Sequence, residues 1–202
     1  QRIMDTRSVE AASTEAEAVA EEKMKGLLME VKSRLQAVGL VHEMLYHGYQ
    51  RRQIDIFSYL TSLGDNILSS SVQNPGRISI EYRVPSVQMN IKTVIPLGMI
   101  FSELMTNVVK YAFPGERTGA VRVVLEGENR EEGENKEHEE AKKYTLTVAD
   151  NGVGLPEDYT HRKEDSIGHL LVSSLSKQID GEFSMTREEG ETRCVVTFFS
   201  QS

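Results

Sequence analysis

Residues 97–113 read LGMIFSELMTNVVKYAF, and this stretch predicts a helix that ends before Pro114. Glu103, Asn107 and Lys110 fall at positions i, i+4 and i+7, so a carboxylate, an amide oxygen and an ammonium share one side of the helix. This row suits a nucleotide phosphate and its Mg²⁺, because a small hard cation takes oxygen ligands. The row alone is a weak signal, since charged stripes on helices usually face only water.

Two later segments place glycines beside polar groups. In ADNGVG, residues 149–154, an apolar strand ends at Asp150, and two glycines then let the backbone turn and approach a ligand closely. Asp150 can accept a hydrogen bond from an exocyclic amine, which favours adenine over guanine. An ordinary Asn-Gly turn is the alternative for this hexapeptide. In SIGHLLV, residues 166–172, Gly168 stands at a helix start, where backbone N–H groups bind anions.

The surrounding segments predict a layered α+β domain. Helices are expected at residues 97–113 and 168–178, and the acidic insert 127–143 predicts a solvated hairpin loop. The order β, β, helix, β, β, helix, β, β predicts a two-layer α/β sandwich with helices on one face of a mixed sheet. Strands are expected at residues 77–84, 90–93, 120–126, 144–150, 182–187 and 192–199.

The N-terminal part of the chain has a different character. Apolar positions there alternate in steps of four and three, which is the pattern of a coiled-coil seam: Met24, Leu28, Val31, Leu35, Val38, His42 and Leu45. We expect one helix from about Thr14 to about His47, ended by Gly48, and a second helix at residues 54–70. Residues 1–5 are interpreted as the last turn of a preceding helix. The seam needs a partner, either a missing upstream helix or a second copy of the chain. Residues 1–72 thus form a helical region and residues 73–202 a second domain.

Composition excludes several classes of protein. The 202 residues carry a formal net charge of -8, so the chain has no overall field to attract nucleic acid or anionic lipid. The only cysteine, Cys194, excludes an intramolecular disulfide framework, makes a structural zinc site improbable and suits a reducing cytosol. No apolar run approaches the ~18–20 residues that cross a bilayer, so no membrane contact is expected.

The sequence lacks an initiator methionine and looks like a cut through a longer protein. Because no GxxxxGK[ST] segment occurs, the P-loop fold is excluded as the nucleotide site.

Together, residues 103–107, 150–154 and 166–172 resemble the N box and the two glycine boxes of the GHKL (Bergerat) ATP-binding fold. The resemblance narrows to one bacterial subfamily of two-component sensor histidine kinases. It is carried further by IPLG at 95–98, KYAFP at 110–114 and VHEMLY at 41–46, and it extends over roughly residues 30–199.

The resemblance implies roles for individual residues. Asn107 would bind Mg²⁺, Lys110 would meet phosphate oxygens, and Glu103 would polarise or orient the acceptor, so these three form the catalytic set. The implied ATP-binding residues are Asn107, Lys110, Tyr111, Asp150, Gly152, Gly154, Ser166, Gly168 and Leu170. Residues 155–167 would form a short mobile lid, with Arg162 or Lys163 reaching the phosphates. His169 departs from the family pattern, which usually has an aliphatic residue there.

The implied activity is protein histidine kinase activity in the bacterial cytoplasm, with ATP and Mg²⁺ as cofactors. The partners would be a response regulator receiver domain and a second copy bound through the N-terminal helix.

The resemblance places the acceptor histidine upstream of this chain, so this chain alone would fail to phosphorylate itself. His42 is a weak candidate, because it occupies the seam and is expected to be buried. A GHKL ATPase or anti-sigma-type serine kinase, and a catalytically silent nucleotide-binding scaffold, are the alternatives.

Overall fold

The computed structural model describes residues 2–47, 53–71, 74–128, 141–155, 167–188 and 190–201. The helices of this part are α1 (Arg2–His47), α2 (Ile56–Ser71), α3 (Ile91–Asn107) and α5 (Ile167–Gln178). The strands are β1 (Gln53–Asp55), β2 (Ile78–Arg83), β3 (Gln88–Asn90), β4 (Gly119–Glu128), β5 (Ala141–Asp150), β6 (Glu182–Glu188) and β7 (Glu191–Gln201). A 3₁₀ turn, η1 (Pro75–Arg77), precedes β2, and a π-helical turn, η2 (Val108–Ala112), continues α3.

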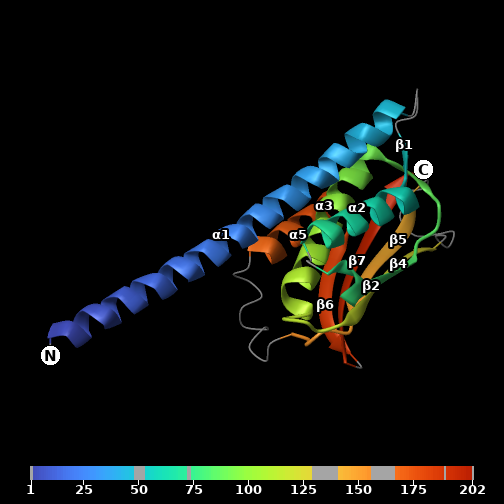
Figure 1. The fold of residues 1–202 in the computed structure, drawn as a ribbon. Coiled ribbons are helices and arrows are strands. Elements are labelled where there is room, and N and C mark those ends of the chain that lie inside the picture. Colours follow the sequence, from blue (N-terminus) through green and yellow to red (C-terminus); the bar gives the residue numbers. More distant parts are fainter. Residues whose placement is uncertain are drawn as a thin grey trace.

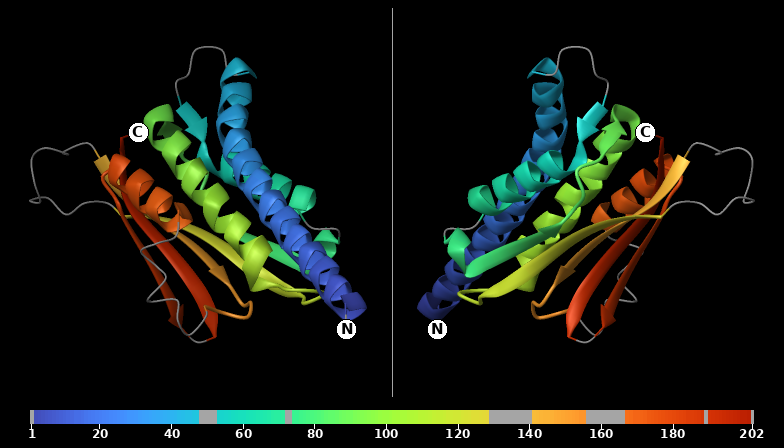
Figure 2. Two further views of the ribbon diagram at one scale, coloured as in Figure 1. Left: turned by 90° about the vertical axis from the view of Figure 1, so that its left-hand side faces the viewer. Right: turned by 90° about the vertical axis from the view of Figure 1, so that its right-hand side faces the viewer.

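Five strands form one mixed sheet in the order β2-β4-β5-β7-β6. Strand β2 runs parallel to β4, and the other neighbouring pairs are antiparallel. Helices α2, α3 and α5 lie on one face of this sheet (Figure 1; Figure 2). The predicted α+β sandwich with helices on one face is therefore confirmed.

The core forms where alternating strand residues meet the helical layer. Along β4, Val121, Val123 and Leu125 are buried, while the residues between them are half-buried, as expected for a strand with one covered face. Helix α3 supplies the opposing side chains, among them the fully buried Leu97 and Phe101. The hydrophobic core therefore holds α3 directly against the centre of the sheet.

The start of α3 differs from the prediction. The helix begins at Ile91 because the Asn90 side chain accepts a hydrogen bond from the Lys92 backbone N–H at 3.0 Å and caps the first turn. The strand expected at residues 90–93 is therefore wrong for residues 91–93, and Pro96 lies inside the helix. The short strand there is β3, which ends at the cap and pairs with β1, a strand that the sequence did not predict.

Helix α1 is longer than expected. It begins at Arg2 rather than near Thr14, so the interpretation of residues 1–5 as part of a separate helix is wrong. Its C-terminal half packs against α3 and α2, whereas its N-terminal half projects beyond the body of the molecule (Figure 1). Gly48, the expected end of the helix, lies outside the described residues. No helix of the described ranges has the length and apolar character to span a bilayer.

The face of α1 that packs on the body is not the predicted seam. Among the α1 residues whose side chains the structure describes, Ser33, Ala37 and Val41 are buried. From Met24 to Val38 the seam residues stay at the surface, with exposed fractions of 52% for Val31 and 68% for Leu35. His42 is also exposed, so its expected burial is wrong for this single chain.

A buried tyrosine joins three helices. The Tyr59 hydroxyl, on α2, donates to the Ala37 carbonyl oxygen on α1 at 2.9 Å, and the phenol ring lies against Gly98 of α3. A Cβ added at Gly98 would lie 1.8 Å from the Tyr59 hydroxyl oxygen. Burial raises the pKa of the Tyr59 hydroxyl, so it remains a neutral donor. Glycine at position 98 therefore sets how closely α2 and α3 approach.

We expect Gly98→Ala to destabilise the protein by about 1–3 kcal/mol, because the buried, hydrogen-bonded Tyr59 has little room to move away. The matched control is Gly39→Ala on α1, where an added Cβ meets no atom within 4 Å. The control should leave stability unchanged or raise it by up to about 1 kcal/mol. Urea unfolding measures both variants, and equal stability of the two would contradict this packing role.

Candidate nucleotide-binding site

A cavity of about 470 Å³ opens where α3, its π-helical turn and the start of α5 meet the sheet. Asn107, Asp150 and Gly168 all line this cavity, although they come from three separate segments of the sequence. Its volume lies in the range of small-molecule sites. Further lining residues are mostly apolar and include Leu104, Val108, Val172, Phe183, Met185 and Cys194.

Asp150 is the buried acid of the cavity. It ends β5, is only 6% exposed, and accepts a hydrogen bond from the Gly152 backbone N–H at 2.9 Å. Burial raises the pKa of Asp150, and the charge of Glu191 adds to this rise, while the bond from Gly152 opposes it. A carboxylate has several lone pairs, so Asp150 can still accept a hydrogen bond from a ligand.

The turn after Asp150 is tied to the neighbouring elements. The Asn151 side-chain oxygen accepts from the Ala120 backbone N–H at 2.8 Å, which anchors the turn to β4. Gly152 packs on the π-helical turn so closely that an added Cβ would lie 2.4 Å from the Ala112 carbonyl oxygen. Gly154 has a φ of +83° and lines the cavity. The first glycine thus fixes the turn, and the second shapes the cavity wall.

The π-helical turn η2 sets the direction of the side chains after Asn107. Asn107 ends the regular part of α3 and lines the cavity, and Tyr111 lies on the turn, also lining the cavity, with 65% of its surface exposed. Single π turns occur often at functional sites, because they rotate the next side chains relative to a regular helix. The sequence predicted one continuous helix to Phe113 and gave no signal for this change.

The start of α5 forms another wall. Gly168 lines the cavity and leaves no room for a side chain, since an added Cβ would lie 2.3 Å from Glu103 Oε1. His169 also lines the cavity, and its ring centroid lies 5.3 Å from that of Phe183. Leu170 lies on the exposed side of the helix. Ser166 and the residues expected to reach from the lid, Arg162 and Lys163, lie outside the described residues.

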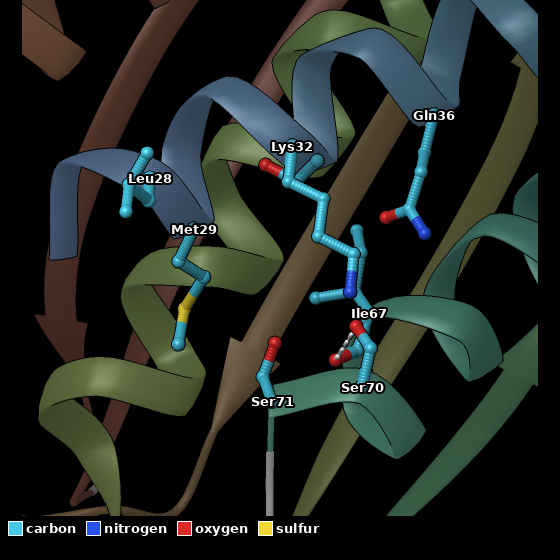
Figure 3. A pocket seen from close by; sticks show the side chains of 8 residues that line it. Leu28, Met29, Lys32, Gln36, Ile67, Ser70 and Ser71 are labelled. Atoms are coloured by element: carbon cyan, nitrogen blue, oxygen red, sulfur yellow. Dashed lines mark hydrogen bonds between the residues drawn. The ribbon is translucent and has the colours of Figure 1, made fainter. Parts of the chain in front are cut away.

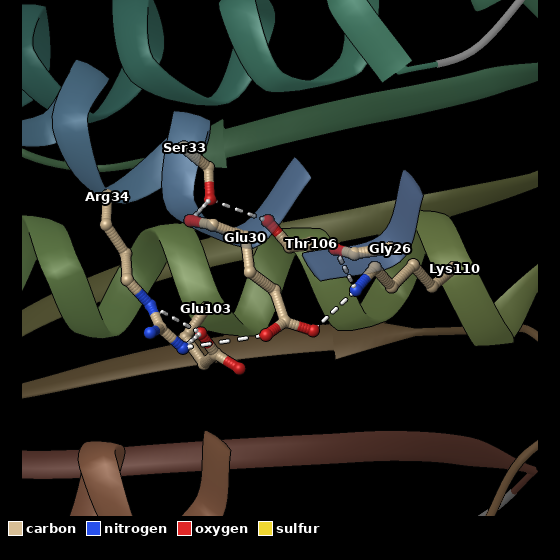
Figure 4. Close-up of polar contacts among 7 residues, drawn as sticks. All are labelled: Gly26, Glu30, Ser33, Arg34, Glu103, Thr106 and Lys110. Atoms are coloured by element: carbon tan, nitrogen blue, oxygen red, sulfur yellow. Dashed lines mark hydrogen bonds and ion pairs between the residues drawn. The ribbon is translucent and has the colours of Figure 1, made fainter. Parts of the chain in front are cut away.

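The predicted polar row on α3 is divided between two surroundings. Asn107 lines the cavity, whereas Glu103 and Lys110 contact α1 (Figure 4). Arg34 Nη2 lies 2.7 Å from Glu103 Oε2, and Lys110 Nζ lies 2.5 Å from Glu30 Oε1. Neither α1 partner was predicted from the sequence. Their only signal was a Glu-Arg pair at i and i+4, which is common on solvated helices.

A second, smaller hollow of about 160 Å³ lies between α1 and α2 (Figure 3). Lys32 extends across it toward Ser70, and Leu28, Met29 and Ile67 supply apolar walls. None of the residues that line this hollow belongs to the three segments of the larger cavity. The larger cavity is therefore the candidate site.

The donor set fits a metal that arrives with its ligand. No group of three or more His, Cys, Asp or Glu side chains suited to a metal ion occurs in the described part of the chain. Asn107 lines the cavity and carries one neutral amide oxygen. Mg²⁺ commonly keeps several waters and takes few protein ligands plus substrate phosphates, so a single amide oxygen is compatible with a nucleotide-borne Mg²⁺.

The mixed sheet, the helices on one face, and the cavity between an asparagine helix and two glycine segments define an ATP-binding domain of the GHKL class. Residues 92–201 match the family model described as "Histidine kinase-, DNA gyrase B-, and HSP90-like ATPase", and the chain belongs to this family. Residues 11–71 match a second model, HisKA_2, described as "Histidine kinase".

Similar proteins are bacterial histidine kinases. Blue-light-activated histidine kinase 2 of Erythrobacter litoralis is 26% identical over 146 residues, which cover 71% of this chain and 37% of that protein. Sensor histidine kinase PdtaS of Mycobacterium tuberculosis is 29% identical over 173 residues, covering 81% of this chain and 30% of that protein. The chain thus spans about a third of the length of these curated relatives.

Solved structures support the fold. The histidine kinase domain of the Erythrobacter litoralis EL346 blue-light-activated kinase superposes with a TM-score of 0.67 at 22% identity, covering 84% of this chain and 74% of that one. Full-length ShkA, solved in complex with AMPPNP, gives a TM-score of 0.50 at 19% identity, covering 74% of this chain and 32% of that one. At these sequence identities, the structural similarity establishes the fold alone.

The buried charge of Asp150 has a consequence for stability. A carboxyl whose pKa is raised on folding favours the folded state at low pH, and this contribution is lost as the pH rises through its folded pKa. At neutral pH the buried carboxylate therefore costs stability. We expect Asp150→Asn to be more stable than wild type at pH 7 by about 0.5–1 kcal/mol, because the amide oxygen can still accept from Gly152.

This gain should shrink toward zero at about pH 4 and below, where the wild-type carboxyl also becomes neutral. Urea unfolding of the nucleotide-free protein at both pH values provides the measurement. A difference between the two proteins that does not change with pH would exclude the buried charge as its cause.

Proposed function

We propose that this chain binds Mg-ATP and transfers the γ-phosphate to a histidine side chain in two-component signalling. The observation that carries this proposal is the meeting of Asn107, Asp150 and Gly168 in one cavity. The family membership of residues 92–201 supports nucleotide binding, and the HisKA_2 match supports a histidine as the acceptor.

Asp150 would select the base. An ionised carboxylate accepts but does not donate hydrogen bonds, so it pairs with the exocyclic amine of adenine. Guanine presents a carbonyl oxygen at the equivalent ring position, and two acceptors facing each other in a buried site are unfavourable. The apolar walls formed by Leu104, Val172 and Met185 suit a planar base.

Asn107 and Gly168 would bind the other end of the nucleotide. The Asn107 amide oxygen would be the protein ligand of Mg²⁺, which, when bound, neutralises charge on the phosphates. Gly168 lies in the first turn of α5, a 12-residue helix whose N-terminal N–H groups favour an anion. Tyr111, at the cavity wall, would lie beside the nucleotide.

Phosphoryl transfer depends mostly on placement and on neutralisation of charge. Lys110 would meet the phosphates only after its ammonium leaves Glu30, because in this structure that pair faces α1. Glu103 would polarise or orient the acceptor imidazole. This role likewise requires a rearrangement, since Glu103 is 2% exposed and paired with Arg34.

We further propose two binding partners for this chain: a second copy of itself and a response regulator. The exposed seam on α1 would bind a second copy of the chain, because a row of large apolar side chains at heptad spacing buries itself against another helix. The phosphate would pass to an aspartate on a response regulator receiver domain, in the bacterial cytoplasm. The acceptor histidine is expected on another helix, and His42, which is exposed, remains the candidate within this chain.

Nucleotide titration by calorimetry tests base and metal recognition. Wild type is expected to bind ATP about tenfold or more tightly than GTP, and Asp150→Asn to lose most of this preference. Asn107→Ala is expected to bind ATP equally with and without Mg²⁺, whereas wild type binds more tightly with Mg²⁺. Equal affinity of wild type for ATP and GTP would refute the role of Asp150. Full Mg-ATP affinity in Asn107→Ala would favour a silent scaffold.

The transfer step is tested with γ-labelled ATP and a histidine kinase hairpin supplied in trans. Label that is stable to alkali and labile to acid marks phosphohistidine, and we expect it on the hairpin. His42→Gln should retain the wild-type level of labelling on the hairpin, because the acceptor is expected elsewhere; label on this chain itself that His42→Gln abolishes would identify His42 as the acceptor. Steady phosphate release that depends on Glu103, without any labelled histidine, would instead favour a GHKL ATPase.

A further inference from the structure

We propose that α1 contributes two positioning residues to the phosphate end of the nucleotide site. Glu30 competes with the nucleotide for the Lys110 ammonium, and Arg34 neutralises the Glu103 carboxylate behind Gly168. The inference rests on the proposed ATP-binding function and deepens it. It predicts that removal of these two charges changes ATP affinity in opposite directions.

The Lys110 ammonium is held by α1. Its Nζ donates to Glu30 Oε1 at 2.5 Å and to the Gly26 carbonyl oxygen at 2.9 Å, and only 12% of its side chain is exposed (Figure 4). An ammonium has three donors, and two of them are engaged by α1. Because this ammonium faces α1 and is almost enclosed, a phosphate oxygen that recruits Lys110 must draw it away from the Glu30 carboxylate. The Glu30 carboxylate and the phosphate compete for one ammonium, so a stronger interaction of Lys110 with either anion weakens its interaction with the other.

The Glu103 carboxylate lies between Arg34 of α1 and Gly168 of α5. Arg34 donates to Glu103 Oε2 from Nη2 at 2.7 Å and from Nε at 3.3 Å. The other oxygen, Oε1, lies against Gly168, where it would be 2.3 Å from an added Cβ. The Glu103 carboxylate thus connects α1 to the cavity wall that is expected to receive the phosphates. Without the Arg34 guanidinium, an uncompensated negative charge would lie behind that wall and repel the nucleotide.

The four charged side chains form one row that alternates in sign. The order is Lys110, Glu30, Arg34, Glu103, and Arg34 Nη2 lies 3.8 Å from Glu30 Oε2, which joins the two ion pairs. The row of charges is neutral as a whole. Loss of Glu30 leaves an excess positive charge near the phosphate site, and loss of Arg34 leaves an excess negative charge.

Other contacts keep α1 in place when one charge is removed. Thr106 of α3 donates to the Ser33 hydroxyl at 3.2 Å, and Tyr59 of α2 donates to the Ala37 carbonyl oxygen at 2.9 Å. Both bonds are buried and involve no charged group. A general loosening of α1 would shift ATP affinity in the same direction in both variants, so opposite shifts identify an electrostatic effect.

The experiment compares Glu30→Gln and Arg34→Gln by calorimetric titration with Mg-ATP and with adenosine. Glu30→Gln is expected to bind Mg-ATP roughly three- to tenfold more tightly than wild type, and Arg34→Gln more weakly by a similar factor. Adenosine affinity should stay unchanged in both, because adenosine carries no phosphate. Arg34→Lys, which keeps the positive charge, should restore most of the affinity lost in Arg34→Gln.

Two charge-matched controls lie on the same helix. Glu21→Gln removes a carboxylate that pairs with Lys25 on α1, 2.6 Å away and exposed. Lys32→Gln removes a cation that faces α2 across the smaller hollow (Figure 3). Both controls should bind Mg-ATP like wild type.

The outcomes for wild type and for the variants test the proposed function and the role of α1 separately. If wild type binds Mg-ATP and both Glu30→Gln and Arg34→Gln bind it with the wild-type affinity, the inference about α1 is overturned and the proposed function stands. Shifts in the same direction, or equal shifts for adenosine, overturn it as well. An affinity in Arg34→Lys as low as in Arg34→Gln would also overturn it. If wild type binds no ATP, the proposed function itself fails.

Discussion

The burial of α3 between the sheet and α1 is the constraint on which the rest of the structure depends. Helix α3 packs its apolar residues against the strands, while Ser102, Glu103 and Thr106 are buried as well, so the helix is enclosed on nearly every side. A buried carboxylate needs an opposite charge, because an unpaired ion in a protein interior is strongly unfavourable. Arg34 supplies that charge from α1. The long helix thus supplies the counter-charge that a buried carboxylate of α3 needs, and the polar row of α3 is divided between α1 and the cavity.

The cavity concentrates features that do not favour stability. Asp150 is a buried acid with a raised pKa, Gly168 leaves a wall without a side chain, and the π-helical turn departs from the regular α-helix. Each is unfavourable or neutral for folding alone, and each places a group where a ligand can use it. Sites of this kind commonly trade stability for function. The apolar alternation of the strands and the packing around Tyr59 and Gly98 offset these costs elsewhere in the fold.

The sequence predicted the layers of the fold and the three segments that meet at the cavity, because both depend on local signals. Hydrophobic periodicity located the main strands, and glycines next to Asp150 and at position 168 marked places of close backbone approach. The strands β1 and β3 have three residues each, too few to show alternation. The sequence pattern places residues 91–93 in a strand, although they form the first turn of α3, because the cap at Asn90 is visible only once the helix start is known. The partners Glu30 and Arg34 depend on how α1 packs, which no local pattern encodes.

Helix α1 has two faces of different character: one packs on α3 and α2, and the other carries the exposed seam. The residues that face α3 and α2 lie two positions after the residues of the exposed seam, as Glu30 comes after Leu28, Ser33 after Val31 and Ala37 after Leu35. Two residues correspond to roughly 200° of rotation around a helix, so the two faces point in opposite directions. A helix is stiff over this length, and a partner on the seam therefore acts on the same rigid element that carries Glu30 and Arg34. Because packed helices rearrange between discrete positions rather than deform smoothly, a rotation or shift of α1 imposed at the seam would change the ion pairs at Lys110 and Glu103 together. The charges beside the cavity and the apolar seam are thus linked by the geometry of one helix.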